Sequence, residues 1–84
     1  MQCVVYKSLR QFDYYLFVKK GDGLTRVPET LKALLGDLHE VTELVLHARR
    51  KLAQADVLEV MAQIEAQGFF LQMPPRRGAD TAAS

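Results

Sequence analysis

Apolar and polar positions between 56 and 73 predict a helix that leads directly into a strand. The helical face is formed by apolar residues at helical spacing, Val57, Val60, Met61 and Ile64. Asp56, with Glu59 three residues later, is typical of a capping box at the start of a helix. Gly68 suits the left-handed turn that ends one. The aromatic-rich run at 69–73 then predicts a strand, which the following prolines terminate.

Upstream of this unit, apolar runs predict three further strands, at residues 2–7, 14–18 and 43–47. Residues 9–13 read as a short polar connection around Phe12, which makes the first two strands a hairpin. Residues 37–41 read as a loop. We expect a core that includes Leu46, Ile64, Phe69 and Leu71.

A second, shorter helix is predicted between Pro28, which a first helical turn accepts, and Gly36. Its apolar face is formed by Val27, Leu31, Leu34 and Leu35. Because it spans only two turns, packing rather than intrinsic propensity must stabilise it.

The predicted order is strand, strand, helix, strand, helix, strand, which indicates an α+β or α/β sandwich with a mixed four-stranded sheet packed by two helices. Strand–helix–strand crossovers normally join parallel strands, so strands 14–18, 43–47 and 69–73 are expected to run together. Strand 2–7 is then antiparallel. We expect one helix on each sheet face. Residues 1–75 form a single domain, and the polar residues 76–84 are predicted to be a disordered tail.

Composition narrows the class of protein. The chain has 84 residues, of which 49% are hydrophobic, enough for one small core. No apolar run approaches the ~20 residues that span a bilayer, so no membrane association is expected. The one cysteine, Cys3, cannot form an internal disulfide, which suits a reducing compartment. We therefore expect a cytoplasmic protein.

The side chains that could carry catalysis or bind a metal do not form a recognisable motif. Cys3, His39 and His47 lack the paired spacing of metal ligands, so no metal or cofactor is predicted. Cys3 lies within an apolar strand, where thiols are usually inert, and Ser8 has no triad context. No catalytic residue can be named, and we expect that the protein is not an enzyme.

Basic residues follow three of the predicted strands. The clusters are Lys19 and Lys20, then Arg49, Arg50 and Lys51, then Arg76 and Arg77. If those strands are parallel, the clusters meet at one edge of the sheet, where ligands of open α/β sheets tend to bind. Solvation of a loop explains the same charges more simply. Lys19, Lys20, Arg49, Arg50 and Lys51 are therefore candidate residues for binding a partner or an anion.

Five segments in the same order carry a resemblance to a known family. They are CVVYKS at 3–8, YLFV at 15–18, RVP at 26–28, RKL at 50–52 with Ala55 and Asp56, and GFFLQMPP at 68–75. Together they resemble the YcgL family of small bacterial proteins over nearly all of residues 3–75. The resemblance implies a compact α/β sandwich from a Gram-negative bacterium, and no established activity. Where the family has an aspartate and a glycine, this chain has His47 and Ala48, so no role is carried over there.

These observations favour a small, non-catalytic, cytoplasmic interaction or adaptor module. Its expected partner is a protein that the sequence does not identify, and we expect a monomer or a weak homodimer. The alternative is a protein that binds nucleic acid or another polyanion through the basic sheet edge.

Overall fold

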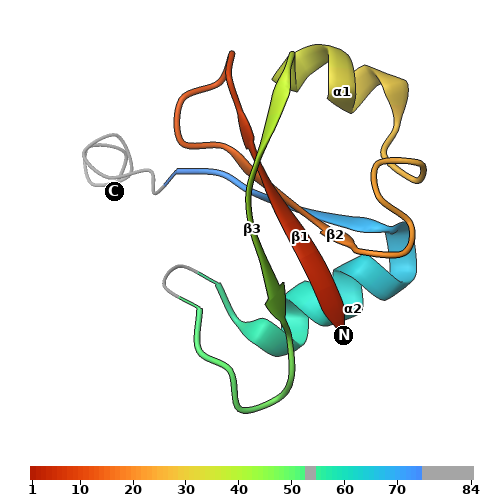
Figure 1. Cartoon of the computed structure of the whole chain (residues 1–84), viewed down its shortest axis with the longest axis vertical. Coiled ribbons are helices and arrows are strands. Elements are labelled where there is room, and N and C mark those ends of the chain that lie inside the picture. Colours follow the sequence, from red (N-terminus) through yellow and green to blue (C-terminus); the bar gives the residue numbers. More distant parts are fainter. Residues whose placement is uncertain (53–54, 75–84) are drawn as a thin grey trace, which may run out of the picture.

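The computed structural model describes residues 1–52 and 55–74. In chain order its elements are β1 (Gln2–Ser8), β2 (Tyr15–Lys19), α1 (Glu29–Leu35), β3 (Leu38–Val45), α2 (Val57–Gln67) and β4 (Phe69–Gln72). This is the predicted order, and the α+β fold class with two helices is confirmed (Figure 1). The predicted tail at 76–84 lies outside the described residues.

The four strands form one sheet in the order β3-β1-β2-β4, and every hydrogen-bonded neighbour is antiparallel. The prediction of parallel neighbours in a mixed sheet is therefore wrong. β2 and β3 do run in the same direction, but β1 lies between them. The connection from β2 through α1 to β3 therefore joins strands of the same direction, as expected, but it passes over β1 instead of joining neighbours.

The prediction that β4 runs with β2 is also wrong, and the turn at Gly68 explains why. α2 ends near the end of β2, where Lys19 Nζ lies 3.8 Å from Glu65 Oε1. Because Gly68 alone connects α2 to β4, the new strand must enter the sheet at that point. Val18 accordingly pairs with Phe69, and β4 runs antiparallel to β2.

The strand β3 begins at Leu38, although residues 37–41 were predicted to be a loop. Its register with β1 shifts between Thr42, which pairs with Val5, and Glu40, which pairs with Tyr6. Val41 is therefore an extra residue, a β-bulge that interrupts the alternation of side chains. Since alternation is the sequence signal of a strand, the bulge hid the first half of β3.

Two apolar clusters pack on opposite faces of the sheet, and each face has one helix, as predicted. Cys3, Val5 and Phe17 face α2, and this cluster is completed by Leu46, Val57, Val60 and Ile64. The cluster on the α1 side consists of Val4, Leu16, Val18, Val27 and Leu35. Neighbouring strand residues alternate between the clusters, so both faces of β1 and β2 are buried. These two central strands hold the remaining elements in place.

The boundaries of α2 are those that the sequence predicts. Asp56 Oδ1 accepts a hydrogen bond from the Leu58 N–H at 2.9 Å. Gly68 has a φ of +94°, and a Cβ there would lie 2.4 Å from Arg26 Cβ, so both conformation and space require glycine. Leu46 and Ile64 are buried, as predicted. The side chains of β4 are only half-buried, so the core prediction overstates the burial of Phe69 and Leu71.

Candidate functional site

The connection between β1 and β2 is attached to the carboxyl end of α1. The buried Ser8 hydroxyl donates to the Leu35 carbonyl and accepts hydrogen bonds from the N–H groups of Arg10 (3.2 Å) and Gln11 (2.8 Å). The Leu9 N–H donates to the Asp37 carbonyl at 2.9 Å. The connection and the helix end lie side by side (Figure 1). A polar sequence predicted as a simple link is therefore a fixed part of the fold.

This attachment satisfies the carbonyls at the end of α1, which have no partner within the helix. The C-cap N–H of Gly36 bonds the Lys32 carbonyl, and the remaining donors are Arg10 Nη1 for Ala33 (3.0 Å), Gln11 Nε2 for Leu34 (3.5 Å) and the Ser8 hydroxyl for Leu35. The Arg10 cation is also favourable at the negative end of the helix dipole. Since each carbonyl has its own donor, the connection and α1 are held together as one unit.

The unit exposes three large apolar side chains. Phe12 is 81% exposed, Leu9 64% and Leu34 49%. Leu34 was predicted to lie on the packed face of its helix, and this is wrong, because Leu35 and Leu31 take up that face. We call the residues Leu9, Phe12 and Leu34, with the segments that hold them, the loop–helix corner. The sequence signal of this feature was the presence of two apolar residues, Leu9 and Phe12, in an otherwise polar connection.

Two of the predicted basic residues, Lys19 and Lys20, lie at the end of β2 and have acidic partners. Lys20 Nζ is 3.0 Å from Glu43 Oε1 on β3, and Lys19 contacts Glu65 on α2. These pairs are about half exposed. Each pair lowers the positive potential that an anionic ligand would meet.

The other predicted cluster, Arg49, Arg50 and Lys51, is exposed in the connection that follows β3. The Arg50 N–H donates to the His47 carbonyl, which places both arginines in a turn. Because β2 and β3 run in the same direction, Lys20 and this connection belong to the same end of the sheet. β4 runs the other way, so the parallel arrangement on which the predicted gathering of the third cluster depended is wrong. Arg76 and Arg77 lie outside the described residues.

Cys3 is fully buried on the α2 side of β1, and burial raises the pKa of its thiol above the ordinary value of 9.0. A thiol that stays protonated and inaccessible is a poor nucleophile. His39 is exposed on β3 and His47 just beyond it. Within residues 1–52 and 55–74, no group of three His, Cys, Asp or Glu side chains could hold a metal ion.

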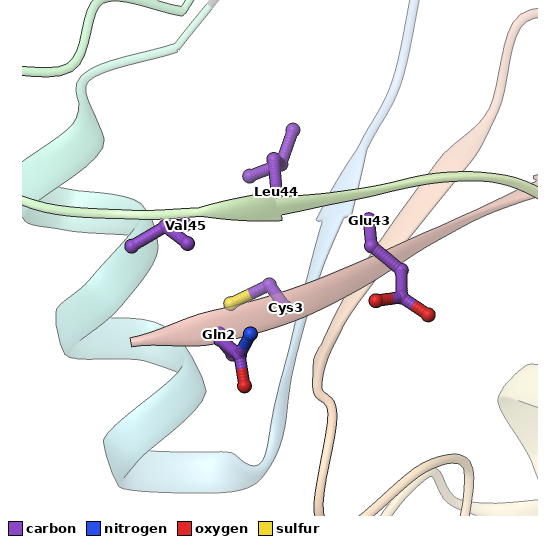
Figure 2. Close-up of a pocket in the computed structure, with 5 residues that line it drawn as sticks. All are labelled: Gln2, Cys3, Glu43, Leu44 and Val45. Carbon is purple, nitrogen blue, oxygen red and sulfur yellow. The ribbon is translucent and has the colours of Figure 1, made fainter.

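A hollow of about 200 Å³ lies where β1 and β3 pair near the amino end of the chain. Its lining residues are Gln2, Cys3, Glu43, Leu44 and Val45. In Figure 2 the side chains of Gln2, Glu43 and Val45 point to one side of the ribbon, and those of Cys3 and Leu44 to the other. Among these five lining residues, Glu43 alone is an acidic or basic residue.

In the described part of the chain, no helix is both long and apolar enough to cross a membrane. The fold and these surfaces define a small α+β domain with an antiparallel sheet, one helix on each face and an exposed apolar corner. The profile of the YcgL domain matches residues 3–75, and the chain belongs to this family. The resemblance of the five sequence segments is thereby confirmed.

The relatives are bacterial proteins described only as containing a YcgL domain. One from Stutzerimonas stutzeri is 52% identical over 73 residues, which cover 87% of this chain and 75% of that protein. One from Pseudomonas putida is 48% identical over the same shares of both chains. A relative from Shewanella piezotolerans is 47% identical over 75 residues, 89% of this chain and 81% of its own.

Proposed function

We propose that this domain is a non-catalytic interaction module that binds a protein partner through the loop–helix corner. The observation that carries the proposal is the 81% exposure of Phe12 on a connection whose side chains bond to carbonyls of α1 and whose backbone bonds to the Ser8 hydroxyl. The single cysteine suits a reducing compartment, and we place the module in the cytoplasm.

The attachment of the corner makes the proposal physically reasonable. Binding normally costs conformational entropy, because flexible loops and side chains must be ordered at the interface. Here the hydrogen bonds of Ser8, Arg10 and Gln11 have already ordered the connection. Burying a side chain such as Phe12 from water contributes roughly 1.5–3 kcal/mol. Well-packed aromatic side chains are also typical centres of protein–protein interfaces.

The charges around the corner favour a protein partner over a polyanion. Arg10 and Lys32 supply two positive charges, whereas Asp13, Glu29 and Asp37 supply three negative ones in the same segments, with Lys32 and Glu29 paired to each other. A polyanion would be repelled by the carboxylates of Asp13 and Asp37. A protein surface carries both signs, so it can match this arrangement.

Binding of nucleic acid through the basic end of the sheet is the second candidate. Arg49, Arg50 and Lys51 are exposed and support it. The pairing of Lys19 with Glu65 and of Lys20 with Glu43 counts against it. Each glutamate offsets the positive charge of its lysine, so two of the five candidate basic residues attract an anion less strongly. We therefore place protein binding first.

The test is recovery of partners from a bacterial lysate, with and without nuclease, by the parent chain and two variants. Phe12→Ser removes the exposed aromatic side chain of the corner. Leu58→Ser is the matched control, because Leu58 is 56% exposed on α2. We expect nuclease-resistant partners with the parent and with Leu58→Ser, but not with Phe12→Ser. Recovery that nuclease abolishes would favour the second candidate.

A further inference from the structure

The strand β3 is an edge of the sheet with little cover on either face. It pairs with β1 on one side, and its other side has no neighbouring strand in the part of the chain that the structure describes. Residues 39–43 and Val45 are exposed, with Val41 at 50% and Val45 at 46%. An edge of eight residues with exposed valines is a template for another strand.

The hydrogen bonds at the end of β3 identify the backbone groups that point away from β1. Met1 and Leu46 exchange both main-chain bonds, with the Met1 ammonium donating at 2.9 Å and the Leu46 N–H at 2.7 Å. Antiparallel pairs alternate between bonded and non-bonded residues. By that alternation Leu44 is bonded to β1, whereas Val45 and Glu43 direct their N–H and C=O groups outwards.

The two residues with outward backbone groups also share one face. Their side chains point to the same side of the ribbon and line the hollow of about 200 Å³ (Figure 2). A strand added to this edge would place one side chain beside Glu43 and another, two positions along, beside Val45. On the added strand, a basic residue would complement the Glu43 carboxylate and an apolar residue would pack against Val45.

From this geometry we propose that β3 accepts an extended peptide of another protein as a fifth strand, with Lys or Arg opposite Glu43 and an apolar residue opposite Val45. The interaction uses a surface distinct from the loop–helix corner, and it goes beyond the proposed function by naming the chemistry of a partner. An adaptor needs two such separate surfaces.

Charge selects a basic peptide over a second copy of this chain. Pairing of two β3 strands with Glu43 in register would set two carboxylates opposite each other, which is destabilising. A shifted register would set each carboxylate against Val45 and supply no cation. Lys20 Nζ contacts Oε1 of Glu43, so a basic strand can bind the other oxygen of this carboxylate, and it finds a second carboxylate in the exposed Glu40. The charges that protect the edge from self-pairing therefore attract this partner.

The test is titration of the isotope-labelled chain with two peptides, followed through the backbone amide signals. The first is a blocked eight-residue peptide, Thr-Lys-Thr-Val-Thr-Lys-Thr-Val, matched to the length of β3. The second has Glu in place of Lys. We expect the amides of Glu43 and Val45 to shift and to exchange more slowly with the first peptide. The acidic peptide should bind roughly three- to tenfold more weakly.

Three variants keep the test specific. Val45→Pro removes an outward N–H without removing a bond to β1, so the fold should remain and peptide binding should be lost. Val45→Thr is the control that keeps the N–H and should bind. Glu43→Lys should reverse the preference between the two peptides.

Three results would overturn the proposal. The first is that neither peptide binds at about 1 mM. The second is unchanged binding by a folded Val45→Pro chain. The third is a shift of the Glu43 and Val45 amides with protein concentration alone, which would make a second copy the occupant. Each of these results leaves the binding at Phe12 untouched, so failure here is separate from failure of the proposed function.

Discussion

The Ser8 hydroxyl on β1 donates to the main-chain carbonyl of Leu35, which lies 27 positions away at the end of α1. The same oxygen accepts from two N–H groups of the following connection. Three backbone groups thus depend on one buried side chain, and this contact fixes the position of the loop–helix corner.

Ser8→Ala should therefore destabilise the domain by about 1–3 kcal/mol, because it leaves buried polar groups without a partner. Urea denaturation measures the change. Thr25→Ala is the control, since the Thr25 hydroxyl makes a single exposed bond to the Asp22 carbonyl and should matter by no more than roughly 0.5 kcal/mol. Equal effects of the two substitutions would contradict the role of Ser8.

Ile64→Ala should destabilise the domain by about 2–5 kcal/mol, because Ile64 is 1% exposed within the cluster beneath α2. That loss approaches the whole stability of so small a domain, so the variant should be largely unfolded at 37 °C. Thermal unfolding followed by circular dichroism is the measurement. A melting temperature within a degree or two of the parent would show that Ile64 is not a core residue.

The buried thiol of Cys3 should make stability fall at alkaline pH. Burial raises the pKa of this thiol in the folded state, so above the ordinary value of 9.0 the unfolded chain loses the proton first. The folded state then binds more protons than the unfolded state, and raising the pH favours unfolding. Stability should decline more steeply above pH 9.0 in the parent than in Cys3→Ala. Identical slopes in urea denaturation would contradict this.

Changing Lys19, Lys20, Arg49 and Arg50 together to Gln should leave stability within roughly 0.5–1 kcal/mol of the parent, because exposed ion pairs contribute little. The same variant tests the polyanion alternative on a heparin column. We expect weak retention of the parent at most, even at ~50 mM salt, where non-specific binding is strongest. Strong, salt-sensitive retention that the variant loses would favour nucleic-acid binding.

The sequence predicted α2 and its surroundings most accurately, because the relevant signals are local. Asp56 and Gly68 act within a few residues of their positions, and the apolar spacing of Ile64 and its neighbours depends only on the helix itself. Strand order is not local. The direction of β4 relative to β2 depends on where α2 ends in space, and the residues of β4 carry no signal of that position.

The loop–helix corner could not be predicted for a related reason. Arg10 reads as an exposed charge in the sequence, and its bond to the Ala33 carbonyl exists only once α1 packs beside β1. Val41 illustrates the opposite case, in which a local irregularity, the bulge, concealed a strand that long-range pairing with β1 stabilises.

The most direct test of the interaction proposal is a photo-crosslinking amino acid placed at position 12 in living bacteria that produce this chain. A chain with the crosslinker at position 58 is the control, because Leu58 is exposed on α2 rather than at the corner. The account predicts a discrete protein adduct from position 12 and none from position 58. Absence of any adduct from position 12, or the same adducts from both positions, would contradict it.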